Sequence, residues 1–110
     1  MHKSDAEYLI LKQLENNPHL TQREISKELG VSLGKTNYVI NALIDKGLLK
    51  LNNFKRSDNK LGYSYLLTAQ GITEKTMLAQ KFLKRKSDEY NRLKEEIEIL
   101  ENELLERQSK

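Results

Sequence analysis

The stretch LGVSLGKTNYVINALIDKGLL, residues 29–49, decides the fold because it contains a helix end, a helix start and a second helix end. Gly30 is suited to the left-handed backbone that terminates a helix, and Ser32 can cap the helix that follows. Helical spacing places the buried positions of this helix at Thr36, Ile40, Leu43 and Ile44. Gly47 is its predicted end. The stretch therefore predicts a tight turn leading into a short amphipathic helix.

The residues before this stretch predict two further helices. Residues 5–16 carry an apolar face, and the sequence NNP at 16–18 ends that helix. The face is formed by Leu9, Ile10, Leu11 and Leu14. Thr21 can cap a second helix, with Glu24 at the capping-box position three residues later. The helix that starts after Thr21 and the helix that starts after Ser32 are therefore expected to be joined by the turn at Gly30.

The residues after Gly47 change to the pattern of a β-hairpin. Residues 48–51 form a short apolar stretch, and GYSYLL at 62–67 alternates as a strand does. Between them, NNFKRSDNK is rich in turn-forming residues. The sequence predicts a two-stranded hairpin with a long basic tip that carries Lys55, Arg56 and Lys60.

A single helix of about 40 residues is expected from Thr68 onward, because the rest of the chain lacks proline and has glycine only at Gly71. Its later part places apolar residues at the a and d positions of a heptad, which predicts a coiled-coil dimer interface. These residues are Leu83, Tyr90, Leu93, Ile97, Leu100 and Leu104. A helix folded back on its own domain is the alternative. The charges leave the direction of a coiled coil open, since a parallel pair joins Glu89 to Lys94 but also Glu96 to Glu101.

The charges are segregated along the chain. The net charge is +3 overall, but residues 1–87 hold 15 Lys or Arg against 8 Asp or Glu, a net +7. Residues 88–106 hold two basic and eight acidic residues. A basic head with an acidic tail is typical of a domain that binds a polyanion, joined to a part that stays off it.

Helix, turn, helix and basic hairpin in this order predict a winged helix-turn-helix, in which the second helix of the pair enters the major groove of DNA. The fold class expected is mainly α with a small β-hairpin, divided into a DNA-binding domain at 1–68 and a long dimerisation helix at 69–110. Base contacts are predicted from Lys35, Asn37, Tyr38 and Asn41. Phosphate contacts are predicted from Thr21, Gln22, Arg23, Ser32, Lys55, Arg56 and Lys60. The ring of Tyr38 could instead pack on the first helix.

Three segments resemble the MarR-type winged-helix regulators associated with bacterial exopolysaccharide gene clusters. They are SLGKTNYVINALIDKG at 32–47, NFKRSDNKLGYSYLLTAQGITEK at 53–75 and FLKRK at 82–86. The resemblance covers residues 8–90 and implies a small transcriptional regulator acting on genes for surface polysaccharide synthesis. Larger MarR proteins build effector pockets from helices at both ends of the chain. Here the first helix starts at about residue 5, so a small-molecule effector is not expected.

Other chemistry finds little support in the sequence. The chain has no cysteine, and its two histidines, His2 and His19, lie far from any acid or nucleophile constellation, so neither an enzyme nor a metal site or cofactor is expected. No signal peptide or membrane span is evident, which predicts a cytoplasmic bacterial protein. The rival function is a winged-helix scaffold that binds protein instead of DNA. Its strongest feature is the acidic helix, with Glu95, Glu98 and Glu106.

Overall fold

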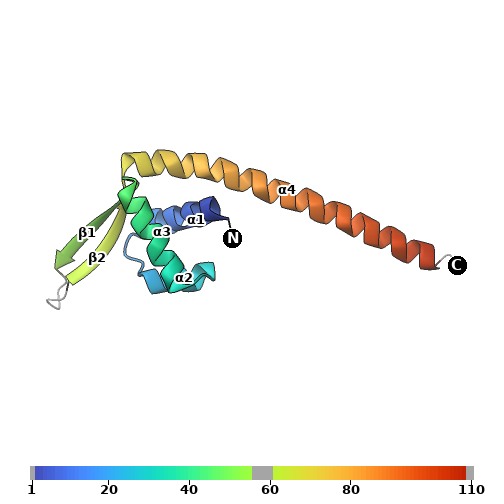
Figure 1. The fold of residues 1–110 in the computed structure, drawn as a ribbon, viewed down its shortest axis with the longest axis horizontal. Helices are drawn as coiled ribbons and strands as arrows, with labels where there is room; N and C mark the ends of the chain where they lie inside the picture. The colour runs from blue at the N-terminus through green and yellow to red at the C-terminus, as the bar shows by residue number, and fades with distance from the viewer. Residues whose placement is uncertain (1, 56–60, 109–110) are drawn as a thin grey trace.

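The computed structural model describes residues 2–55 and 61–108, and at residues 54, 55 and 61 it describes the backbone only. Within these residues the chain forms a small head from which one long helix projects, giving overall extents of 75 × 29 × 21 Å (Figure 1). The elements are α1 (Lys3–Asn16), α2 (Gln22–Leu29), α3 (Leu33–Asp45), β1 (Leu49–Lys55), β2 (Leu61–Leu67) and α4 (Ala69–Gln108). The predicted fold class, a mainly helical winged helix-turn-helix with a small hairpin and a long C-terminal helix, is confirmed.

Two boundaries differ from the expectation. Helix α1 begins at Lys3 because His2 acts as its N-cap, its Nδ1 accepting from the backbone N–H of Ser4 at 3.2 Å. The strands are longer than the apolar pattern indicated, since antiparallel pairing continues from Leu49↔Leu67 to Lys55↔Leu61. The turn-forming residues Asn52 and Asn53 therefore lie inside β1, and Lys55 is its last residue rather than part of the hairpin tip.

The core lies between α1, α2, α3 and the base of the hairpin. Its fully buried members are Ile10, Leu11, Leu14, Ile25, Ile40 and Leu43, joined by Val39, Leu48, Leu49 and Leu78. Of the positions predicted on α3, Thr36, Ile40 and Leu43 are buried, whereas Ile44 is only half-buried. Ile44 packs at the edge of the core, whereas Val39 is one of its buried members.

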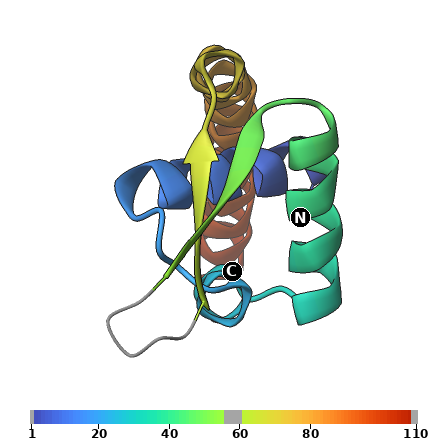
Figure 2. The ribbon, with the colours of Figure 1, turned by 90° about the vertical axis from the view of Figure 1, so that its left-hand side faces the viewer.

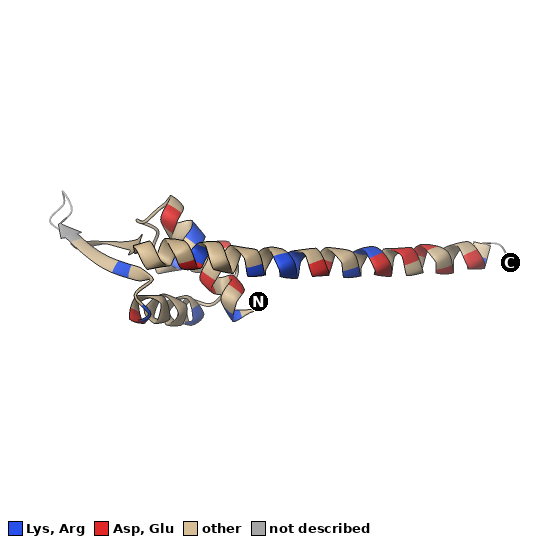
Figure 3. Cartoon of the chain, turned by 90° about the horizontal axis from the view of Figure 1, so that it is seen from above, with Lys and Arg blue, Asp and Glu red and all other residues tan. Residues whose placement is uncertain are grey.

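The first part of α4 packs against α1. Leu78 enters the core, and the rings of Tyr8 and Phe82 lie 5.1 Å apart between centroids. Arg85 Nε donates to Asp5 Oδ1 at 2.9 Å, and this is an ion pair at the point where the helix leaves the head. From residue 86 to residue 108 every residue is exposed, so α4 is both part of the head and a free rod (Figures 1 and 3).

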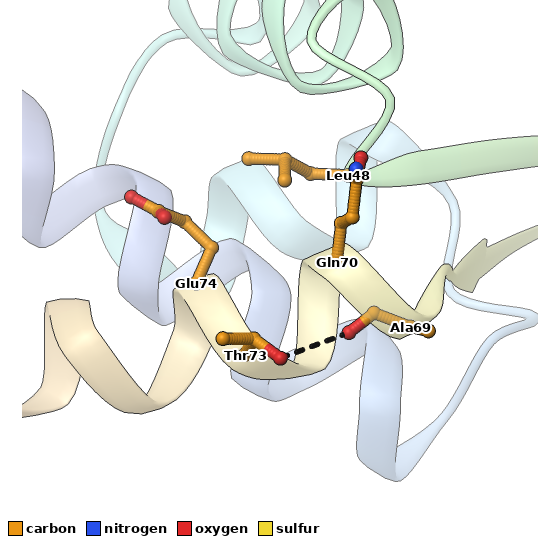
Figure 4. A pocket seen from close by; sticks show the side chains of 5 residues that line it. All are labelled: Leu48, Ala69, Gln70, Thr73 and Glu74. Carbon is orange, nitrogen blue, oxygen red and sulfur yellow. Dashed lines mark hydrogen bonds between the residues drawn. The ribbon is translucent and has the colours of Figure 1, made fainter.

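The joint between the hairpin and α4 is closely packed. The Thr68 hydroxyl accepts from the N–H of Gly71 at 3.0 Å and donates to the carbonyl of Gly47 at 2.6 Å, so it caps α4 as predicted. A Cβ built on Gly71 would lie 2.1 Å from the carbonyl oxygen of Leu48. Beside this joint is an open hollow of about 400 Å³ (Figure 4). Leu48, Ala69, Gln70, Thr73 and Glu74 line it.

Candidate nucleic-acid interface

The turn between α2 and α3 is held by caps and by one buried hydroxyl pair. Thr21 and Glu24 form the predicted capping box, Gly30 adopts a φ of 68°, and the Ser32 side chain accepts from the N–H of Lys35 at 3.0 Å. Between the two helices, Ser26 Oγ donates to Thr36 Oγ1 at 2.8 Å in the interior. These hydrogen bonds hold the turn, the start of α3 and one point of contact between α3 and α2 in place.

The outer side of α3 is polar and accessible. We define the reading face as Gly34, Lys35, Asn37, Tyr38 and Asn41. Tyr38 is 65% exposed, which excludes its burial against α1, while Lys35 is half-buried at the edge of this face. A Cβ placed on Gly34 would have no described atom within 4 Å apart from its chain neighbours and the backbone of its own helix, so the helix is open to close approach at its start. The residues predicted to contact bases thus lie together on one surface.

A row of hydrogen bonds connects the reading face to the hairpin. Asn41 Nδ2 donates to Asn37 Oδ1 at 3.2 Å, and Asn37 Nδ2 donates to Gln22 Oε1 at 3.1 Å. Gln22 Nε2 then donates to the hydroxyl of Tyr65 on β2 at 3.1 Å. Sequence patterns do not predict this row, because its members are separated by up to 43 residues. The side chain of Gln22, predicted to contact phosphate, is one of its members.

The hairpin is anchored beside α2. The N–H of Tyr65 donates to the carbonyl of Pro18 in the α1–α2 connection at 3.0 Å, and Tyr65 and Leu67 pack against the core. Figure 2 shows the hairpin and α3 in front of α4, with α2 between them at the lower end. Of the cations predicted on the tip, Arg56 and Lys60 lie outside the described residues, as does the side chain of Lys55.

The other predicted phosphate contacts lie at two helix starts. Arg23 is exposed in the first turn of α2, directly after the cap Thr21, and Ser32 caps α3. The first turn of a helix has backbone N–H groups without an intrahelical acceptor and carries a partial positive charge, both of which favour an anion. The structure thus places these predicted phosphate contacts at the starts of α2 and α3.

From Leu83 onward, α4 exposes a stripe of large apolar side chains. We define the seam as Leu83, Tyr90, Leu93, Ile97, Leu100 and Leu104. These residues are between 51% and 66% exposed, while Ile99, also 58% exposed, lies on the opposite side of the helix. Leu78, Phe82 and Arg85 contact the head, and Lys75 pairs with Glu15 of α1, whereas Leu83 and every residue from 86 to 108 are exposed. The head therefore leaves the seam uncovered.

Metal-binding and membrane-spanning features are absent from the described part of the chain. Among residues 2–55 and 61–108, no three acidic or histidine side chains lie close enough to hold a metal ion. No helix in this part is both long and apolar enough to cross a membrane.

Two helices joined by a fixed turn and followed by a two-stranded wing define a winged helix-turn-helix domain. Residues 3–50 match the family model described as winged helix-turn-helix DNA-binding. No curated protein sequence matches the chain.

Solved structures of MarR-type regulators share this fold. A MarR/EmrR family transcriptional regulator from Acinetobacter sp. ADP1 is 21% identical with a TM-score of 0.59, over 74% of this chain and 56% of that one. Wild-type MarR from E. coli, in its apo form, is 24% identical with a TM-score of 0.55, over 68% and 54% of the two chains. A MarR protein from Peptoclostridium difficile is 20% identical with a TM-score of 0.63, over 94% and 66%. The match thus spans about half the length of the first two proteins.

Proposed function

We propose that this protein is a transcriptional regulator that binds double-stranded DNA in a sequence-specific manner. The observation that carries the proposal is the exposed amide-rich face of α3, held beside a wing by the capped turn. Asparagine amides can pair with adenine in the major groove, and lysine can donate to guanine or to phosphate. The net +7 of residues 1–87 supplies the long-range attraction to a polyanion.

The test is the salt dependence of binding to a duplex of random sequence. Removing one cation that binds phosphate should reduce the slope of log affinity against log salt by about one unit. We expect Arg23→Ala to produce this change and to weaken binding to all sequences alike. Lys84→Ala, an exposed cation on α4, is the matched control and should leave the slope unchanged. Salt-independent or undetectable binding by the full chain would contradict the proposal and favour the protein-binding scaffold.

We further propose that two copies associate through the seam to form a homodimer. A run of large apolar residues at heptad spacing is stable in water only when it is covered, and a second identical helix supplies the matching surface. The acidic residues that flank the seam also keep the rod away from DNA. A symmetric pair would present two reading faces to an operator with two-fold symmetry.

The seam can be tested with two isoleucines that are similarly exposed. Ile97, in the seam, is 51% exposed and Ile99, on the opposite side, is 58% exposed. Sedimentation of the full chain should give a dimer, Ile97→Asp a monomer and Ile99→Asp a dimer. The monomer should bind a full operator much more weakly, because the two half-sites are no longer engaged together. Equal dissociation of both variants, or of neither, would refute the seam as the interface.

The target genes are proposed from the sequence resemblance. We infer that the operator lies beside genes for exopolysaccharide synthesis, and that the protein acts in the bacterial cytoplasm without cofactor or small-molecule effector. Selecting bound fragments from genomic DNA, with no ligand added, is the direct test. Sites concentrated beside such a cluster support the inference, while sites elsewhere reject it.

A further inference from the structure

The amides in the row from Tyr65 to Asn41 differ in how many of their donors and acceptors are engaged within the row. A primary amide has two N–H donors and one oxygen with two lone pairs. Gln22 and Asn37 each engage both their oxygen and their nitrogen within the row. Asn41, at the exposed end, engages only one N–H with the described residues. Toward those residues it therefore keeps an oxygen and an N–H available on the same planar group.

These two available atoms match one base. In the major groove adenine presents an N–H donor at N6 and an acceptor at N7, and a carboxamide can pair with both at once. The match does not depend on the direction of the row. If every amide were turned over, Asn41 would give one oxygen lone pair to Asn37 and would still keep a second lone pair and its N–H groups.

The row also restricts the orientation of the terminal amide. Binding restricts the freedom of a surface side chain, and a side chain that is already hydrogen-bonded loses less freedom. The fixed end of the row is the half-buried Tyr65, whose backbone N–H is bonded to the carbonyl of Pro18. The orientation of the amides on α3 is thus connected to the position of β2.

We propose that Asn41 recognises an adenine in the major groove, and that Tyr65, Gln22 and Asn37 position its amide. The assignment rests on the DNA-binding function proposed above. In this assignment Gln22 and Asn37 orient the amide of Asn41. They do not themselves make the phosphate and base contacts that were expected from the sequence. The wing strand β2 then contributes to sequence specificity through the hydroxyl of Tyr65, not through a contact of that hydroxyl with DNA.

The experiment is selection of bound sites from a randomised duplex library by the full-length protein and its variants. The parent should prefer adenine at one position in each half-site, and Asn41→Ala should reduce that preference by about 5- to 150-fold. Tyr65→Phe should reduce preference at the same position by about fivefold, the effect of one hydrogen bond. Tyr63→Phe, the matched removal of an exposed hydroxyl on the same strand, should change nothing there.

Two further measurements separate positioning from a general structural effect. Thermal unfolding should be similar for all three variants, and Tyr65→Phe should have no added effect on this base position in the Asn41→Ala background. An unchanged adenine preference in Asn41→Ala would overturn the assignment. An effect of Tyr65→Phe that persists without Asn41 would overturn the positioning role. Failure of the parent to bind any duplex would instead refute the DNA-binding function, and this assignment with it.

Discussion

Replacing Gly71 with alanine tests the joint between the head and α4. The new Cβ would lie 2.1 Å from the carbonyl oxygen of Leu48 and 3.1 Å from its carbonyl carbon. Even close C–H···O contacts are about 3.3 Å long, so one element must move by about 1 Å. Leu48 cannot give way easily, because its N–H donates to the carbonyl of Leu43 at 2.9 Å and its carbonyl accepts from Thr68 at 3.1 Å. The strain therefore falls on the first turn of α4.

The size of the effect follows from two opposing contributions. Overpacking of a closely packed site costs about 1–3 kcal/mol. Alanine is favoured over glycine in a helix by up to about 1 kcal/mol, which offsets part of that cost. We expect Gly71→Ala to lower the free energy of unfolding by about 1–2 kcal/mol. Gly34→Ala, in the first turn of α3 with nothing described within 4 Å of its Cβ, should raise it by up to about 1 kcal/mol.

The assay is urea unfolding followed by circular dichroism, with all proteins at one concentration because association adds to stability. The difference between the two glycine variants should appear as a shift of the midpoint in opposite directions with an unchanged slope. A Gly71→Ala protein as stable as the parent would refute the close contact between α4 and Leu48. A Gly34→Ala protein that is less stable than the parent would show that the start of α3 is not open.

Three further predictions concern other parts of the chain. A chain ending at Ser87 retains the packing of Leu78, Phe82 and Arg85 on the head, so it should keep a folded head but sediment as a monomer and bind only half-sites with low affinity. Thr36→Val removes the hydroxyl that accepts from Ser26, and urea unfolding should show a decrease in stability of about 1–2 kcal/mol; no decrease would mean that this buried bond contributes nothing. Thr21→Ala removes the N-cap of α2 and should cost about 1 kcal/mol, whereas Thr73→Ala, at an interior helix position, should cost nothing measurable.

The local elements of this fold were predictable because their signals are local. Caps at Thr21, Ser32 and Thr68 and left-handed glycines at 30 and 47 act over three or four residues, so sequence spacing identifies them. The ends of the strands were not predictable in the same way. Asn52 and Asn53 favour a turn in isolation, but pairing with Ser64 and Tyr63 keeps them in β1.

The contacts that join distant segments could not be found from the sequence. The row from Tyr65 to Asn41 depends on the position of β2 beside α2, and the ion pair of Arg85 with Asp5 spans 80 residues. The hydrophobic periodicity of the sequence does not predict such contacts, because each contact involves single side chains. The exposed positions of α3 were predicted correctly from its helical period, but the hydrogen bonds among them depend on tertiary structure.

Because α4 continues without a break from the head into its exposed part, the number of residues between the head and the seam sets the angle at which the seam faces. Each residue inserted after Arg85 would rotate the seam residues from Tyr90 onward by about 100° relative to the head and advance them by about 1.5 Å. An insertion of about seven residues would nearly restore the angle and lengthen the rod by about 10 Å. For two copies joined through the seam, the relative orientation of their DNA-binding surfaces could therefore evolve only in discrete steps.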